Sequence, residues 1–273
     1  LAAFSMRVPV VIHTFHGHLL YGYFSNFIVK AICLVEKVLA RFSNSLIVVG
    51  EKVRDDLLSA GIGDHEKFEV IAPGVETDRK MEKSSMRKKF GLREDQIILL
   101  FVGRLTKIKR LDRLLEAVGL LKEDFPNLLL LVAGGGDMEG SVREMASDLG
   151  SSVKFLGWQK DVSSLYFASD VIVLSSDNEG MPVTLIEAAI AGLPAVTTDA
   201  GSAREVVVNY KTGLVVEKTS MALSQGLRLL LADKKYREGM GHAAQKYAIK
   251  YFSKERLITD HLELYRKLIT SKN

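Results

Sequence analysis

Two glutamates, Glu179 and Glu187, bracket a turn and the start of a helix, and each carboxylate can accept hydrogen bonds from paired hydroxyl groups. Pro182 lies between them at the expected first helical position, where its missing N–H has no intrahelical partner to lose. The backbone N–H groups of this turn, which favour an anion such as phosphate, are those of Gly180, Met181 and Val183. An anion site beside two hydroxyl acceptors indicates one class of ligand, a sugar nucleotide.

A second set of residues offers cations to the same kind of ligand. Arg104 presents a planar fork of donors and Lys109 a mobile point charge, and both kinds of side chain hold phosphate oxygens in proteins. Gly103, directly before Arg104, lets the backbone approach a ligand closely. Breaking a sugar–phosphate bond leaves negative charge on a diphosphate, and preorganised cations lower that barrier without a metal. Because the sequence has no Asp-x-Asp motif to hold a metal–diphosphate complex, we expect no metal and no cofactor.

The order of the elements places these residues at one edge of a parallel sheet. Short apolar runs typical of buried strands alternate with helical stretches, which predicts a parallel sheet covered by helices. The strands are expected at 97–102, 128–133, 153–156, 171–174, 195–198 and 213–216, and the helices at 111–122, 138–149, 162–168, 183–191 and 203–207. Open sheets of this kind bind ligands at the carboxyl ends of their strands, where Arg104 and Glu179 would lie.

An N-terminal β-α-β-α-β series precedes this sheet and indicates the later part of another doubly wound domain. Its strands are expected at 8–14, 45–49 and 68–71, and its helices at 25–41 and 51–59. The lone cysteine, Cys33, falls in the apolar pattern of the first helix and is interpreted as a packed thiol. We predict an α/β fold in which residues 1–90 form part of an N-terminal domain plus a linker, 91–250 a ligand-binding domain, and 251–273 a final helix.

The segment NEGMPVTLIEAAIAGLPAVTTDAGSAREVV, with its E-x7-E spacing, resembles the retaining glycosyltransferases of family 4, which have the GT-B fold. The resemblance implies two Rossmann-like domains, the N-terminal one incomplete here, with the donor in the cleft and the last helix packed back on the N-terminal domain. In the family, a Gly-Arg…Lys element holds the donor diphosphate as it leaves, which assigns this role to Arg104 and Lys109. The family often has glycine after this lysine, where the chain has Arg110.

The resemblance also assigns roles around the sugar and the nucleoside. Glu187 matches a glutamate that accepts from both ribose hydroxyls, and Glu179 matches one bonded to hydroxyls of the donor sugar. The T-F-H-G sequence matches a strand-end histidine facing the donor sugar across the cleft, which points to His16, whose imidazole could bond the sugar or the departing phosphate. The rim of the pocket and the surroundings of the base are assigned to Gly134, Gly136, Trp158 and Gln159.

Each motif has an alternative interpretation. The two carboxylates could be the acid and nucleophile of a glycosidase, but a diphosphate leaving group requires cations rather than a general acid. The glycines of 132–140 could bind a dinucleotide, yet their spacing is not the standard one, and the next strand ends in Leu-Gly-Trp rather than in an acid. His13, His16 and His18 could form a metal cluster, and Trp158 could be a core side chain.

Composition and charge limit the partners. With 47% hydrophobic residues the 273-residue chain can bury a substantial core, and a formal charge of +4 does not require nucleic acid. The basic run 78–90 is interpreted as a solvated linker or helix face, the alternative being a contact with an anionic membrane surface. The apolar span 8–29 contains histidines, glycines and a proline, which argues against a membrane helix. We expect a cytoplasmic protein, free or peripheral at the inner membrane face.

The reaction that these expectations describe is transfer of a sugar from a nucleoside-diphosphate sugar, UDP-sugar favoured, to a hydroxyl of a saccharide or lipid-linked saccharide acceptor, with retention of configuration. The alternatives are a sugar-nucleotide epimerase or hydrolase of the same fold and a nucleotide-binding domain without chemistry. The sequence opens at Leu1, after the place where the family has a strand and a glycine-rich loop. We therefore expect a donor-binding fragment that transfers sugar poorly unless that segment is present.

Overall fold

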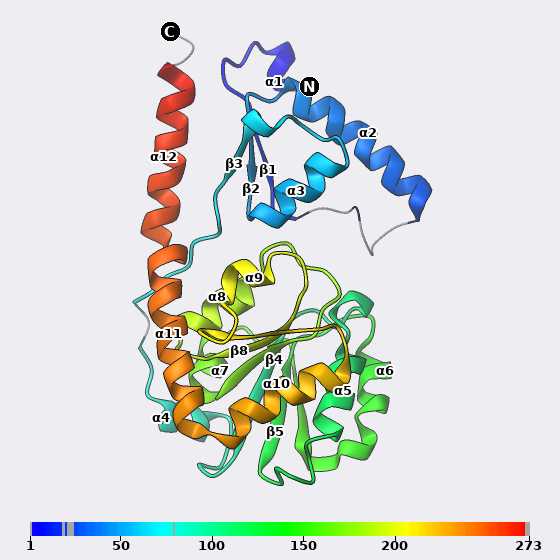
Figure 1. Ribbon diagram of the computed structural model, residues 1–273, viewed down its shortest axis with the longest axis vertical. Coiled ribbons are helices and arrows are strands. Elements are labelled where there is room, and N and C mark those ends of the chain that lie inside the picture. The colour runs from blue at the N-terminus through cyan, green and yellow to red at the C-terminus, as the bar shows by residue number, and fades with distance from the viewer. Residues whose placement is uncertain (1, 18–19, 21–24, 79, 271–273) are drawn as a thin grey trace.

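The computed structural model of the protein describes residues 2–17, 20, 25–78 and 80–270. Its chain forms two α/β units, one above the other in Figure 1, and the helical segment 234–270 runs along the same side of both. The upper unit is built on a three-stranded parallel sheet and the lower unit on a six-stranded parallel sheet. This is the α/β fold with parallel sheets that the alternation of strands and helices predicts.

The lower sheet has the strand order β6-β5-β4-β7-β8-β9, so the direction in which strands are added reverses between β4 and β7. Its strands are β4 (Ile97–Val102), β5 (Leu128–Ala133), β6 (Val153–Gly157), β7 (Val171–Leu174), β8 (Ala195–Thr198) and β9 (Gly213–Val216). Neighbouring strands all pair in parallel, as between Leu99 of β4 and Val171 of β7. The reversal leaves the loops after β4 and β7 next to each other, the position at which open sheets of this kind bind ligands.

Helices cover both faces of this sheet, which explains its uninterrupted apolar strands. They are α5 (Leu111–Gly119), α6 (Glu139–Met145), α7 (Ser163–Ala168), α8 (Val183–Ile190), α9 (Ala203–Val206) and α10 (Ser220–Ala232). Alternate residues of β4 enter different cores, with Leu99 packed in the cluster of α5 and α10, and Leu100 in the cluster of α7 and α8. The lower unit is therefore a three-layer domain with a core on each side of the sheet.

The upper unit contains β1 (Ile12–Phe15), β2 (Ser45–Val48) and β3 (Phe68–Val70), with the helices α1 (Ala2–Ser5), α2 (Asn26–Phe42) and α3 (Glu51–Ser59). The first strand begins at Ile12 rather than at residue 8, and the short helix α1 was not predicted. In α2 the half-buried Cys33 packs against the core, whereas Phe27 and Val38 are exposed. Apolar residues lie on both faces of this helix, so its sequence does not show which face is buried.

The basic run between the two units is not simply solvated. It contains α4 (Lys83–Lys89), in which Arg87 is buried and its Nη2 atom lies 2.7 Å from Asp170 Oδ2. The Nη1 atom of Arg87 also donates to the backbone oxygens of Arg93, Glu94 and Gln96. The interpretation of this run as a solvated linker is therefore wrong for Arg87, which attaches α4 to the lower unit.

The chain crosses between the two units twice, and the two crossings lie side by side. The return crossing joins α11 (Lys234–Phe252) to α12 (Lys254–Thr270), beside the outgoing segment at Val75. The N–H of Val75 donates to the oxygen of Phe252 at 2.8 Å, and the N–H of Lys254 donates to the oxygen of Val75 at 3.0 Å. Beyond this point, Leu264 of α12 is buried in a cluster with Ile47 and Ile71 of the upper unit.

Candidate active site

The loop after β4 and the turn after β7 meet at the reversal point of the lower sheet. The N–H of Asp177 donates to the oxygen of Ile108 at 2.9 Å, and the Ser175 hydroxyl donates to the oxygen of Lys109 at 2.8 Å. These contacts hold the loop 103–109 against the turn 175–179. The structure therefore brings together the cationic loop and the first glutamate of the E-x7-E segment.

Lys109 and Glu179 form an ion pair at this meeting point. The Lys109 Nζ atom lies 2.6 Å from Glu179 Oε1, and the two side chains are only 20% and 11% exposed. The hydroxyl of Ser176 donates to the same carboxylate oxygen at 2.5 Å. The carboxylate of Glu179 is thus fixed by two donors, and the charge of Lys109 is balanced from within the protein.

Arg104 differs from Lys109 in having no such partner. It follows β4 and Gly103, and its exposed side chain makes no hydrogen bond or ion pair with any residue that the structure describes. Its guanidinium can therefore bind an anion without first leaving a carboxylate. Within the described residues, the loop 103–109 therefore carries Arg104 and Lys107 as cations without an ion pair and Lys109 as a paired cation.

Glycines let the neighbouring loops touch through their backbones. A Cβ atom on Gly134 would lie 1.9 Å from the Gly103 oxygen, and one on Gly136 would lie 2.5 Å from the Leu105 oxygen. Gly134 also has a positive φ of 142°. The loop after β5 consequently packs directly on the loop after β4.

The N-terminal unit reaches this site through the end of β1. A Cβ atom on Gly180 would lie only 2.4 Å from the backbone oxygen of His16, so the strand end touches the turn after β7. His16 itself is exposed there, whereas the imidazole of His13 packs on Phe15 and lies 3.8 Å from Glu36 Oε2. His18 lies outside the described residues, within which no cluster of three or more His, Cys, Asp and Glu could hold a metal ion.

The helix α8 begins at Val183, as the expected range 183–191 has it, but Pro182 is not its first helical residue. Pro182 has an extended conformation with ψ 97° and occupies the N-cap position, so the first helical residue is Val183. Three backbone N–H groups of this turn were expected to be free, those of Gly180, Met181 and Val183. None of the three donates a hydrogen bond to a described residue. Met181 and Pro182 are buried, which orders the turn that carries these groups.

Glu187 lies in a different environment from Glu179. The hydroxyl of Tyr166 in α7 donates to Glu187 Oε2 at 2.9 Å, and both residues line a cavity of about 430 Å³ beside the chain crossing at Gly74. Burial of Tyr166, together with the negative charge of Glu187, raises the pKa of the Tyr166 hydroxyl, which stays protonated and donates. The sequence did not reveal Tyr166, because its contact with Glu187 depends on the packing of α7 against α8.

Two arginines, Arg110 and Arg113, form hydrogen bonds with the turn 175–179, and the sequence analysis assigned a role to neither of them. The buried Arg113 donates to the Ser175 oxygen at 2.6 Å and to Asp177 Oδ1 at 2.7 Å. Arg110, where the family often has glycine, has a left-handed φ of 50° and bonds both Asp112 and Asp177. Burial alone would raise the pKa of Asp177, but the bonds from Arg113 and Arg110 outweigh it and lower that pKa.

The residues expected near the base lie at the end of β6. Trp158 is 77% exposed and is therefore not a core side chain. The side-chain amide of Gln159 donates to the Leu156 oxygen at 2.7 Å, and Gly157 between them has a φ of 66°. These residues follow the edge strand, with β5 between them and the strand that carries Arg104.

Residues 82–247 match the family "Glycosyl transferases group 1", and residues 1–79 match "Glycosyltransferase Family 4". EpsD of Bacillus subtilis, whose name assigns it provisionally to the glycosyltransferases, is 32% identical over 85% of this chain and 62% of its own. CapM of Staphylococcus aureus, a glycosyltransferase of capsular polysaccharide biosynthesis, is 26% identical over 96% of this chain and 71% of its own. The crystal structure of Anabaena HepE with UDP-glucose superimposes with a TM-score of 0.86 at 22% identity, covering 98% of this chain and 74% of HepE.

These comparisons agree with the architecture described above. The chain spans a little under two thirds of the length of EpsD, and about three quarters of HepE. The structural neighbours share the two-domain GT-B arrangement of parallel sheets. With more than half of its residues matched by the group 1 model, this chain belongs to the group 1 glycosyltransferases and has the GT-B fold.

Proposed function

We propose that this chain is the donor-binding part of a retaining glycosyltransferase, which moves a sugar from a UDP-sugar to a hydroxyl of a saccharide or lipid-linked saccharide. The observation that carries the proposal is the convergence of Lys109, Glu179 and Gly180 beside the unengaged Arg104. A diphosphate bound there would meet two cations and the free N–H groups at the start of α8. Such groups favour phosphate and stabilise the charge that develops on a leaving diphosphate.

The remaining site residues fit the other parts of the donor. Glu179, held by Lys109 and Ser176, presents its carboxylate near the contact between His16 and Gly180, where the donor sugar would lie. Glu187, oriented by the Tyr166 hydroxyl, lines a cavity and is proposed to accept from the ribose hydroxyls. UDP is favoured as the nucleotide because the solved HepE of the same fold carries UDP-glucose.

We further propose that the transfer needs no metal, since Arg104 and Lys109 supply the positive charge that would otherwise come from a metal ion bound to the diphosphate. No helix of the described residues combines the length and apolar character that crossing a bilayer requires. A peripheral contact with the inner membrane face is a separate proposal. The basic run 78–90 supports it less than its charge suggests, because Lys83, Arg87 and Lys89 all form ion pairs within the chain.

Calorimetric titration with UDP, UDP-glucose and GDP-mannose tests the donor site. Arg104→Ala and Lys109→Ala are each expected to weaken UDP binding about tenfold or more, because charge-assisted hydrogen bonds to phosphate are each worth about 1.5–3 kcal/mol. Arg93→Ala is the matched control, since Arg93 precedes β4 at the opposite edge of the sheet and pairs with Asp95. Equal affinities for the control and for both site variants would contradict the assignment.

Product analysis then separates transfer from the related reactions. The chain is incubated with UDP-glucose and saccharide acceptors, with and without a chelator. Any glycoside formed, in low yield as expected for a donor-binding fragment, should have retained configuration and a yield insensitive to chelation. A changed sugar without acceptor would indicate epimerisation, and free sugar alone would indicate hydrolysis. Loss of product on chelation would overturn the proposal that no metal is needed.

A further inference from the structure

A carboxylate of the lower unit caps a helix of the upper unit. Glu205 of α9 accepts the N–H of Glu51 at 2.8 Å through Oε2 and the N–H of Lys52 at 3.0 Å through Oε1. These are the first two residues of α3, whose N-cap residue is Gly50 and which has no side-chain cap of its own. N–H groups at a helix start lack intrahelical partners and favour negative charge. Glu205, from the other unit, therefore accepts hydrogen bonds from two N–H groups that have no partner within α3.

The residue before α3 is adapted to this contact. A Cβ atom on Gly50 would lie 2.5 Å from Ser202 Oγ and 2.8 Å from Glu205 Oε1. The backbone of Gly50 is extended, with φ −166° and ψ 160°, a conformation that any residue can adopt. Space for a side chain at residue 50 is therefore limited by Ser202 and Glu205 of the other unit, which would have to shift, and not by the conformation of the chain.

The segment that carries Glu205 also leans on the turn of the candidate active site. The N–H of Ser202 donates to the oxygen of Gly180 at 3.1 Å, and a Cβ atom on Gly201 would lie 1.8 Å from the oxygen of Glu179. The same turn also touches the backbone of His16. The segment 201–205 of the lower unit thus contacts both the start of α3 and the turn at Gly180, and that turn also contacts His16 at the end of β1.

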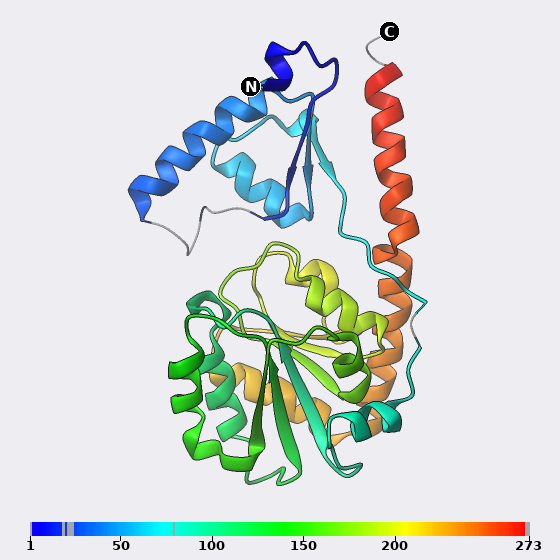
Figure 2. The same cartoon turned by 180° about the vertical axis from the view of Figure 1, so that it is seen from behind.

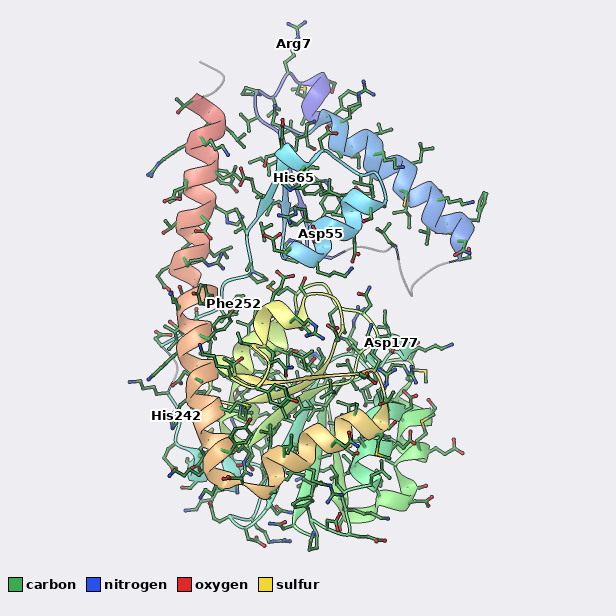
Figure 3. All side chains as sticks on the ribbon, in the orientation of Figure 1. Arg7, Asp55, His65, Asp177, His242 and Phe252 are labelled. Carbon is green, nitrogen blue, oxygen red and sulfur yellow. The ribbon has the colours of Figure 1, made fainter. Side chains whose placement is uncertain are left out.

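From this geometry we infer that Glu205 is a positioning residue for the transfer reaction. By capping α3 it sets the distance between the two units, and it thereby fixes where His16 stands relative to Glu179. The inference rests on the proposed function, because it names what holds that site closed. Beside the contact lies a cavity of about 580 Å³ lined from both units, including Asp55 of α3 and Asp177 of the turn, which Figure 3 labels on either side of the gap.

Two substitutions from opposite units test the inference on the full chain. Glu205→Ala removes the cap, and Gly50→Ala places a methyl group against Glu205 and Ser202. Spin labels on cysteines introduced at the exposed Ser59 and Glu144, in a Cys33→Ser background, report the separation of the units by double electron–electron resonance. UDP calorimetry on the same proteins reports whether the lower unit is folded and competent.

Both variants are expected to shift the distance distribution to longer and broader values. Each should lower kcat about 10- to 100-fold, since displacement of catalytic groups by about 1 Å has effects of this size. UDP affinity should change by less than about twofold, because the proposed donor contacts lie in other residues. Glu205→Gln, which keeps one acceptor oxygen, should be intermediate, and the double variant should be no worse than the sum of its parts because both changes break one contact.

Asp199→Asn is the matched control, because Asp199 lines the same cavity and pairs with Arg204 at 2.7 Å but forms no hydrogen bond or ion pair with the described residues of α3. It should leave the distance distribution unchanged. An unchanged distribution in Glu205→Ala and Gly50→Ala would overturn the inference, as would a loss of kcat without a change in distance. If the parent chain binds no UDP, the proposed function fails, whereas the distances still decide the role of Glu205.

Discussion

The ion pair between Lys109 and Glu179 means that the proposed catalytic cation is already partnered before a donor arrives. A diphosphate must compete with the Glu179 carboxylate for Lys109, whereas Arg104 can be engaged directly. The ion pair should therefore lower the affinity of the site for a nucleoside diphosphate that carries no sugar. A donor whose sugar hydroxyls donate to Glu179 would replace what that carboxylate loses.

Glu179→Gln tests this competition. The substitution removes a negative charge next to the proposed diphosphate site, so UDP affinity should rise about threefold or more at low ionic strength, while turnover of UDP-glucose should fall. Calorimetry with UDP and initial-rate assays with UDP-glucose measure the two effects. Glu123→Gln, on the loop before β5 at the opposite edge of the sheet, should change neither value. Weaker UDP binding in Glu179→Gln would contradict the proposed competition.

The sequence predicted which residues belong to the candidate site better than it predicted which of them contact each other. The sequence indicated Arg104, Lys109, Glu179 and Glu187 as a group, because the first three follow expected strand ends and the resemblance to family 4 implied a role for all four. It did not reveal that Lys109 pairs with Glu179, because that contact depends on β4 lying beside β7 in the sheet. The role of Tyr166 was missed for the same reason, since nothing in a helical aromatic residue signals a partner on the next helix.

At the scale of elements, α4 shows how a basic run can serve packing. Arg87 is buried and joined to Asp170, whose carboxylate also accepts the N–H of Ile98 at 2.7 Å. Asp170 directly precedes β7, so α4 is fastened to the strand that leads into the candidate active site. A count of charges along the sequence cannot distinguish this residue from its solvated neighbours.

Arg87→Met should destabilise the lower unit by about 3 kcal/mol, because it leaves a carboxylate that is 9% exposed without its buried cationic partner. Lys83→Met is the matched control, since Lys83 Nζ bonds the same Asp170 at 2.6 Å but is 49% exposed, and its loss should cost less than about 1 kcal/mol. Urea unfolding followed by far-UV circular dichroism measures both. Equal losses of stability in the two variants would show that burial of Arg87 does not decide the strength of the pair.

The strands of the lower sheet were predicted closely because helices bury both of its faces, which requires uninterrupted apolar runs. The helix α2 was less predictable in orientation. It is apolar on both sides, so periodicity located the helix but did not show that Phe27 and Val38 point away from the core. The first strand was predicted too long because the apolar run at 8–14 continues through Pro9, which cannot donate to a strand ladder.

At the scale of the whole molecule, α12 belongs to the sequence of the second unit but packs on the first. Leu264→Ala should lower the stability of the upper unit by about 2–3 kcal/mol, because Leu264 is buried against Ile47 and Ile71. UDP affinity should be unchanged, since the proposed donor contacts lie in the lower unit. Leu262→Ala, on the same helix and 45% exposed, should have little effect on either property.

Differential scanning calorimetry and hydrogen exchange of the peptide that contains Ile47 measure this effect. Protection should fall in the upper unit of Leu264→Ala and persist in the lower one. A loss of protection spread equally over both units would mean that they unfold together. In that case α12 would couple the stability of the two units rather than support the upper one alone.

The paired crossings at Val75 and Phe252 have a mechanical consequence. Two chain segments that are hydrogen-bonded to each other and run between the same bodies resist sliding and twisting of those bodies, as two leaves of a hinge do. Rotation about the line through them is the softest motion left. Opening and closing of the molecule should therefore follow a single arc, along which His16 approaches and leaves Gly180 by one fixed path.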